Sequence, residues 1–343
     1  MDIFEQKLEE MNFILEKHGL GLIYDVENDR ENGLLMPFFC MFMDSVNQVG
    51  LNFCITTELS IRCGIIHHEK LVFMSYGMFD RLCKLSELIA RSGVITVKEM
   101  PLNFHDLHFV ANPFVGFNNE DREEDELESH FFMFVLECLM LFIVSHEVGH
   151  FINKHGNRET LRNFDGIFDD VLGHREISEA ELIASHAREL VADCFAFNIV
   201  RNHIESVFER KDDYLNNLLP VFDGEKGGVL LSLLIIVSYF KLTDGLSPHE
   251  HFKSTHPSTG ARVRFILSCY VGSLVSDEEI EEVSDEEIEE FAPYYNILMM
   301  QLNSIFKLLG YNSENTWLKS TSSPEMIAWF DKVYIEYPNW KAK

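Results

Sequence analysis

The chain has 343 residues, of which 46% are hydrophobic, so it can bury a large core in one big domain or two modest ones. Its formal net charge of −28 argues against nucleic acid or an anionic membrane as a partner, because both require a basic surface. Much of that charge is local: residues 119–128 hold seven acidic side chains, and residues 275–290, a tandem duplication of Val-Ser-Asp-Glu-Glu-Ile-Glu-Glu, hold ten. We interpret the duplicated run as a solvated acidic insertion, with a weak cation site as the alternative.

The cysteines and the apolar runs indicate a cytoplasmic protein. There are seven cysteines, an odd number, and most lie in apolar segments, as reduced core thiols do. The first twenty residues predict an amphipathic acidic helix and lack the apolar stretch of a signal peptide. As helices, the apolar runs 131–144 and 229–240 would be about 21 and 18 Å long, whereas a bilayer core is about 30 Å thick. We therefore expect buried helices of a soluble protein and no membrane span.

Residues 1–120 are predicted to form an N-terminal α+β part. Apolar residues recur at helical spacing over 1–20 and over 76–91. Between them, short apolar runs predict strands or a helix–strand pair, chiefly a β-hairpin over 61–75. The polar turn of this hairpin, 67–70, is expected to face solvent.

Residues 121–343 are predicted to be helical and to form one compact unit with the N-terminal part. The fold class is therefore α+β and mainly α, with a small N-terminal sheet. Apolar periodicity and glycine or proline stops place the helices of this part at 127–154, 179–201, 203–219, 229–242, 261–272 and 294–309.

The end of the first of these helices carries the pattern His146-Glu147-Val148-Gly149-His150. Residues four apart leave the same face of a helix, so His146 and His150 can bind one zinc ion through their imidazoles. The carboxylate of Glu147 lies beside them, where it can take a proton from a water molecule at the metal. The alternative interpretation is a helix end that carries surface histidines.

A catalytic zinc needs a third protein ligand and one open position. The best candidate is Glu189, which shares one side of its predicted helix with Asp193, an acidic partner one turn further on. The competing ligands are His174 and His186, while His155 stands one position short of the metzincin spacing. The alternative interpretation is that the carboxylates of Glu189 and Asp193 are ordinary solvated side chains.

Three motifs together resemble those of the gluzincin metallopeptidases of the M48 type, the CAAX-protease and HtpX group. They are H-E-x-x-H at 146–150, E-x-x-A-D at 189–193 and T-H-P-x-x-x-x-R at 255–262, and the resemblance covers residues 127–272. The chain is also similar to the Lit-like phage-exclusion peptidases, which are cytosolic proteins with an H-E-x-G-H helix. It departs from the M48 membrane enzymes in lacking their long transmembrane helices, which argues against lipidated or membrane-protein substrates.

The resemblance implies a zincin-like catalytic domain built around an active-site helix. In it His146, His150 and Glu189 would bind zinc, and Glu147 would be the general base. It further implies that His256 faces the zinc and donates a hydrogen bond to the oxyanion of the tetrahedral intermediate, and that Arg262 pairs with Asp193. The alternative for His256 is a residue that caps the following helix.

The expected function is that of a soluble intracellular zinc endopeptidase acting on proteins or peptides. One alternative is a binding or regulatory protein that keeps a zincin fold without turnover. Another is a defence or toxin effector that cleaves one host protein. The sequence indicates neither the substrate nor the oligomeric state.

Overall fold

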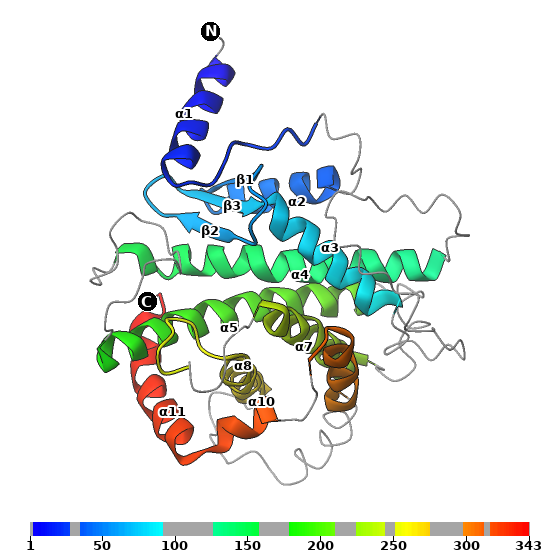
Figure 1. The fold of residues 1–343 in the computed structure, drawn as a ribbon, viewed down its shortest axis with the longest axis vertical. Helices are drawn as coiled ribbons and strands as arrows, with labels where there is room; N and C mark the ends of the chain where they lie inside the picture. The colour runs from blue at the N-terminus through cyan, green and yellow to red at the C-terminus, as the bar shows by residue number, and fades with distance from the viewer. Residues whose placement is uncertain are drawn as a thin grey trace.

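The computed structural model describes residues 3–27, 35–91, 126–157, 178–209, 224–243, 251–274, 298–311 and 316–342. Within these residues the chain is mainly helical and has one three-stranded sheet near its N-terminus (Figure 1). The predicted fold class, α+β and mainly α, is confirmed. The predicted boundary near residue 120, the duplicated acidic run 275–290 and the competing ligand His174 lie outside the described residues.

The sheet contains β1 (Asn52–Thr56), β2 (Cys63–Ile66) and β3 (Leu71–Ser75). Its order is β1-β3-β2, with β3 parallel to β1 and antiparallel to β2. The predicted hairpin is therefore present, and its turn ends at Lys70, whose φ is 51°. All five residues of β3 are buried, because this strand has a partner on both edges and protein on both faces.

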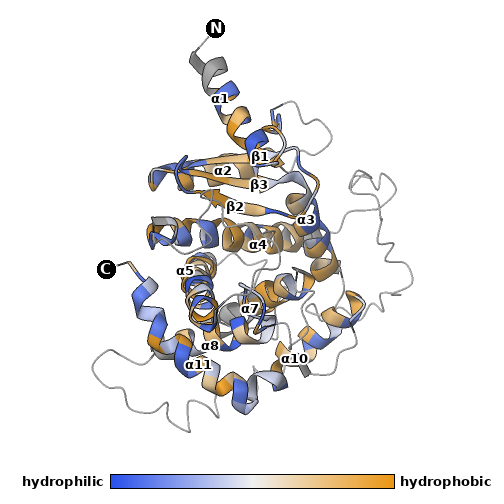
Figure 2. Ribbon diagram, turned by 60° about the vertical axis from the view of Figure 1, so that its left-hand side comes forward, coloured by the Kyte–Doolittle hydropathy of each residue, from blue (hydrophilic) through white to orange (hydrophobic). Residues whose placement is uncertain are grey.

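Three helices accompany the sheet. They are α1 (Ile3–Lys17), α2 (Leu35–Gln48) and α3 (Tyr76–Arg91), and α3 has the bounds that its periodicity predicts. The run that the sequence left open between strand and helix is α2, which carries Pro37 in its first turn, where a missing backbone N–H is tolerated. Figures 1 and 2 show α1 on the outer side of the sheet and α2 at the level of the strands.

The central element is α4 (Glu126–Ile152), a helix of 27 residues. The sheet and α3 pack on one side of it, and α5 (Glu179–Glu209) and α7 (Gly224–Thr243) pack on the other (Figure 2). Because α4 has neighbours on both sides, it is apolar around most of its circumference. Its buried side chains belong to one hydrophobic core with residues of α2, α3 and α7.

The length of α4 corrects one step of the sequence analysis. Its segment Phe131–Ile152 has 22 residues and is, by length and composition alone, able to cross a membrane. In the fold, however, 72% of its most apolar window is buried inside the protein, as in the core helix of a globular domain.

The second layer of helices also departs from the prediction at one point. Residues 179–209 form the single helix α5 of 31 residues, with no break at residue 202. The remaining elements are η2 (His155–Asn157), α8 (Thr259–Leu274), a helical stretch at 298–308, α10 (Thr316–Lys319), η3 (Ser320–Ser322), α11 (Pro324–Glu336) and η4 (Tyr337–Trp340). A second apolar cluster joins α5, α8 and α11. This packing holds α8 and α11 against α5.

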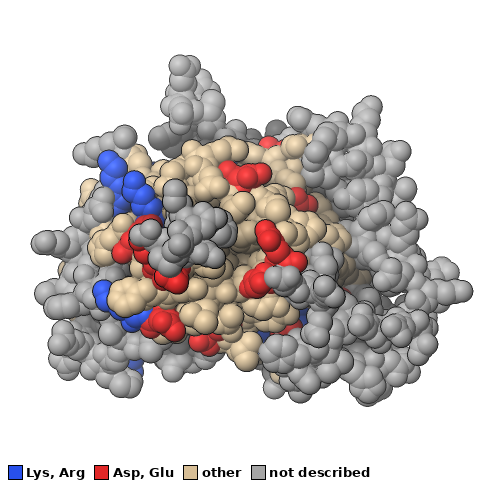
Figure 3. All heavy atoms as spheres, turned by 90° about the horizontal axis from the view of Figure 1, so that it is seen from above, with Lys and Arg blue, Asp and Glu red and all other residues tan. Residues whose placement is uncertain are grey.

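The described surface seen from the side of α1 is mostly uncharged, with acidic side chains at several separate places (Figure 3). The basic side chains visible in this view gather at one edge. The described part of this face therefore carries no broad basic surface.

Candidate metal centre

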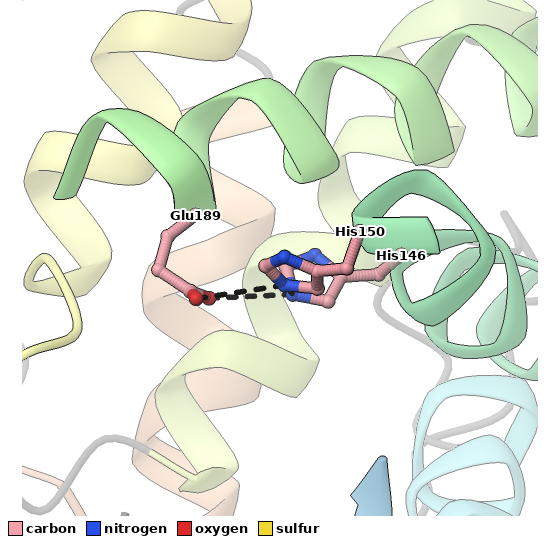
Figure 4. Close-up of side chains that lie close together, drawn as sticks. All are labelled: His146, His150 and Glu189. Atoms are coloured by element: carbon pink, nitrogen blue, oxygen red, sulfur yellow. Dashed lines mark hydrogen bonds and ion pairs between the residues drawn. The ribbon is translucent and has the colours of Figure 1, made fainter. Parts of the chain in front are cut away.

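The last turns of α4 bring His146 and His150 onto the face that meets α5. Gly149 lies at this crossing, and a Cβ there would stand 3.3 Å from Cα of Ala192 and 3.1 Å from the Phe195 ring. The glycine therefore allows the two helices to approach closely. As a result Glu189, one turn before Ala192 on α5, points at both imidazoles (Figure 4).

The three side chains offer ligand atoms at the spacing of a tetrahedral metal site. Nε2 of His146 lies 3.0 Å from Nε2 of His150 and 3.3 Å from Oε2 of Glu189. Nε2 of His150 lies 3.5 Å from Oε1 of Glu189. Ligand atoms at 2.0–2.1 Å from a tetrahedral ion stand about 3.3 Å from one another. The set can therefore hold a metal ion, and all three of its members are buried.

The protonation states of two of these side chains already suit a metal. Burial lowers the pKa of His150 well below its ordinary value, which keeps the ring neutral. Burial alone would raise the pKa of Glu189, but His256 and His150 beside it hold that pKa well below the ordinary value. A neutral imidazole and an ionised carboxylate are the forms that bind metals.

Asp193 supports the third member of the set, His146. Its Oδ1 lies 3.0 Å from Nδ1 of His146, so it orients the ring through the nitrogen that faces away from Glu189. Asp193 is fully buried and accepts two hydrogen bonds from Arg262, at 2.7 Å to Nε and 2.6 Å to the terminal nitrogen. The pair expected between Asp193 and Arg262 is thus present and joins α5 to α8.

Glu147 follows His146 on α4 and is buried, with 9% of its surface exposed. Burial raises its pKa to about 7, against the opposing effect of His146 and with a further rise from Glu189. A carboxyl with a pKa near neutrality can take up and release a proton at physiological pH.

His256 lies beside Glu189. Its Nε2 is 3.2 Å from Oε2 of Glu189, and its side chain is 36% exposed. The turn that carries it is held by two fully buried histidines. His186, one turn before Glu189 on α5, donates from Nε2 to the carbonyl of Ser254 (2.8 Å), and His251 accepts from the backbone N–H of Ser258 (3.0 Å). His186, weighed above as a ligand, instead ties this turn to α5.

His155 contacts the set through His150, which was not predicted from the sequence. His155 is fully buried in η2, just after α4, and its Nδ1 lies 2.7 Å from Nδ1 of His150. The sequence gives His155 no role, because it stands one position short of the metzincin ligand spacing. The short H-x-x-x-H-x-x-x-x-H run was the available signal, because a helix that ends at residue 152 can turn the third histidine back onto the second.

The hairpin turn, expected to be solvated, is partly buried against the same region. His68 is exposed, but His67 has only 8% of its surface exposed and stacks on Phe151, with ring centroids 6.4 Å apart. A Cβ on Gly156 would stand 2.2 Å from the His67 ring, so only glycine fits at this position. Burial lowers the pKa of His67 to about 4 and keeps it neutral.

Comparisons of the chain with protein-family models, with curated proteins and with solved structures found no match in any of the three. The geometry of the site is therefore the basis for its function.

Proposed function

We propose that the chain is a soluble intracellular zinc endopeptidase with a zincin-like fold, similar to the gluzincins. The observation that supports this most strongly is the buried set His146, His150 and Glu189 beside the buried carboxyl of Glu147. Two imidazoles and one carboxylate at tetrahedral spacing are a donor set typical of catalytic zinc, which keeps its fourth position open.

When bound, zinc polarises a substrate carbonyl and lowers the pKa of a water molecule toward about 7. The chain supplies the proton acceptor, Glu147, whose pKa of about 7 is matched to transfer at neutral pH. Asp193 holds the His146 ring in place, and Arg262 in turn holds Asp193. These contacts fix the site on the two helices α4 and α5, as a preorganised site requires.

His256 is proposed to donate a hydrogen bond to the oxyanion that forms when the peptide carbonyl is attacked. Its Nε2 lies beside Glu189, on the same side as the ligand atoms, and its partial exposure leaves room for a substrate. His186 and His251 hold its turn at the backbone atoms of Ser254 and Ser258. Donors of this kind typically contribute about 10²–10³ to turnover.

The outer strand β2 is proposed to align the substrate. β2 pairs with β3 on one edge, and no described strand pairs with its other edge. Its first residue, Cys63, lies near the site: burial raises the pKa of this thiol, and the carboxylate of Glu147 raises it further. An extended peptide that paired with this edge would lie across the face of α4 that carries Glu147.

The non-catalytic alternative is disfavoured by the environment of Glu147. A carboxyl whose pKa is raised to about 7 costs roughly 3 kcal/mol of stability when it is ionised. A protein that used the site only to hold a structural metal would gain stability by replacing Glu147.

None of the seven cysteines forms a disulfide, which supports the proposed reducing compartment.

The test is a proteome-wide search for new N-termini in cells that express either the wild type or Glu147→Gln. We expect new N-termini with the wild type only, while both proteins contain the same amount of metal. A single cleaved protein would favour the defence-effector alternative within the same chemistry. Identical sets of N-termini, with both proteins folded and metallated, would refute peptidase activity in that proteome.

A further inference from the structure

The chain connects the metal centre to its own C-terminus through His155. Nδ1 of this residue lies 2.7 Å from Nδ1 of His150, and its Nε2 lies 3.0 Å from the backbone carbonyl of Trp340, 185 residues further along the chain. The ring of His155 also meets the Trp340 indole edge-on, at 5.9 Å between centroids. All of these contacts are inside the protein, since His155 is fully buried.

These two contacts determine which ring nitrogens of His155 and His150 carry a hydrogen. A carbonyl oxygen only accepts, so Nε2 of His155 must carry the hydrogen that it donates to Trp340. In a neutral imidazole the other nitrogen is then an acceptor, and Nδ1 of His155 accepts from Nδ1–H of His150. The lone pair of His150 is thereby placed on Nε2, the atom that lies beside His146 and Glu189.

The C-terminal residues have a second attachment to the end of α4. The backbone N–H of Ala342 donates to Oδ1 of Asn153 (2.8 Å), and Nδ2 of Asn153 donates to the carbonyl of Gly149 (2.7 Å). On its other side the Trp340 ring lies 4.7 Å from the guanidinium of Arg188, which comes from α5. Residues 337–342 therefore contact both helices that supply the ligands.

We infer that His155 is a positioning residue, which sets the tautomer and the orientation of the ligand His150. Residues 337–342 take part in the metal centre, because the carbonyl of Trp340 accepts a hydrogen bond from His155. This inference rests on the metal centre of the proposed function but not on peptide hydrolysis. It has a thermodynamic consequence: metal binding and docking of the C-terminal residues must favour each other, because each stabilises the same arrangement of His150 and His155.

Substitutions of His155 distinguish a positioning role of this residue from a purely structural one. His155→Gln keeps an amide oxygen that can accept from His150 and an NH₂ that can donate to the Trp340 carbonyl. His155→Leu has a similar volume and offers neither. His203→Leu, on α5 beside Glu137, is the matched control, since it removes an imidazole away from the site.

The experiment measures zinc affinity by competition with a chelator, and the absorption spectrum of the cobalt-substituted protein, in full-length variants. We expect His155→Leu to bind zinc about 10–100-fold more weakly than the wild type and to change the cobalt spectrum. The His155→Gln and His203→Leu variants should stay within about threefold. The inference is overturned if His155→Leu also stays within threefold, or if His155→Gln is as weak as His155→Leu.

A second measurement needs no variant and remains informative if His155→Leu fails to fold. Hydrogen exchange of the wild type is followed at residues 337–343 with and without zinc. We expect zinc to slow exchange there, and unchanged exchange would overturn the coupling. A wild type that binds no zinc at all would instead refute the metal centre, so the two failures are distinguishable.

Discussion

Replacing Arg262 by alanine should destabilise the protein strongly, because it removes the cation that donates two hydrogen bonds to the fully buried carboxylate of Asp193. Asp193 is fully buried, and Arg262 is its cationic partner, with two hydrogen bonds of 2.7 and 2.6 Å. The guanidinium also lies 3.7 Å from the centre of the Phe240 ring. After the substitution, the carboxylate would keep only its contact with His146.

The magnitude follows from the cost of breaking a buried ion pair on one side, about 3–5 kcal/mol. Loss of the cation–π contact with Phe240 adds roughly 0.5–2 kcal/mol. A free energy of unfolding of about 5–15 kcal/mol is typical, so Arg262→Ala should lose about a quarter or more of the total. The metal-free protein is the right species to measure, since a bound metal would add stability of its own.

The assay is urea unfolding at neutral pH. Arg264→Ala is the control: this arginine lies on the same helix, is partly exposed, donates to the carbonyl of Thr321 at 2.6 Å and lies 5.0 Å from the centre of the Phe330 ring, so about 1–2 kcal/mol is expected. The double variant Arg262→Met with Asp193→Leu should recover much of the loss, because neither charge is then left buried alone. The reasoning is refuted if Arg262→Ala costs no more than Arg264→Ala, or if the double variant is less stable than Arg262→Ala.

Three further predictions concern the site. Because burial raises the pKa of Glu147 to about 7, above its unfolded value of about 4.3, the folded metal-free protein binds more protons and its stability falls as the pH rises through this window. Glu147→Gln should abolish that fall and raise the free energy of unfolding at pH 8 by up to about 3 kcal/mol; an unchanged pH profile in urea unfolding would contradict the burial argument. Although burial favours its neutral form, the nearby carboxylates of Asp193 and Glu189 raise the pKa of His146 to about 9, so metal binding must release a proton. Zinc affinity should therefore drop about tenfold for each pH unit below 9, and competition titrations that give the same affinity at pH 6.5 and 8 would contradict it. His256→Ala should keep the metal and the fold but lower kcat about 10²–10³-fold with little change in KM, whereas a kcat within threefold of the wild type would exclude a transition-state donor.

Helices with a clear apolar stripe could be predicted from the sequence, and α3 is the best example, with its bounds correct at both ends. The break expected in α5 was wrong for a physical reason. Arg201, Asn202 and His203 form a polar group that looked like a connection, but they lie on an exposed or half-buried side of a continuous helix. Local polarity alone does not distinguish a solvated helical face from a loop.

In the site, the residue pairs that share one face of a helix could be predicted from their spacing along the sequence. His146 and His150 follow from a four-residue interval, and Glu189 with Asp193 follows from another. The pairing of Asp193 with Arg262, 69 residues away, came from the resemblance to a family, since no periodicity links α5 to α8.

The contact between His155 and Trp340 could not have been predicted in this way. It joins residues 185 positions apart, and the group that accepts is a backbone carbonyl, which any residue would supply. Tertiary packing of the C-terminal residues decides it. The burial of His67 has the same origin, because the hairpin turn packs on the end of α4 around Phe151 and Gly156.

The most direct test of the metal centre is the metal content of the protein purified without added metal, measured for the wild type and for Glu189→Ala. We expect about one zinc per wild-type chain, since its three ligand atoms all lie within 4.8 Å of one another, and a large loss of zinc in the variant. A wild-type chain without a transition metal, or a Glu189→Ala variant that keeps a full equivalent of zinc, would contradict it.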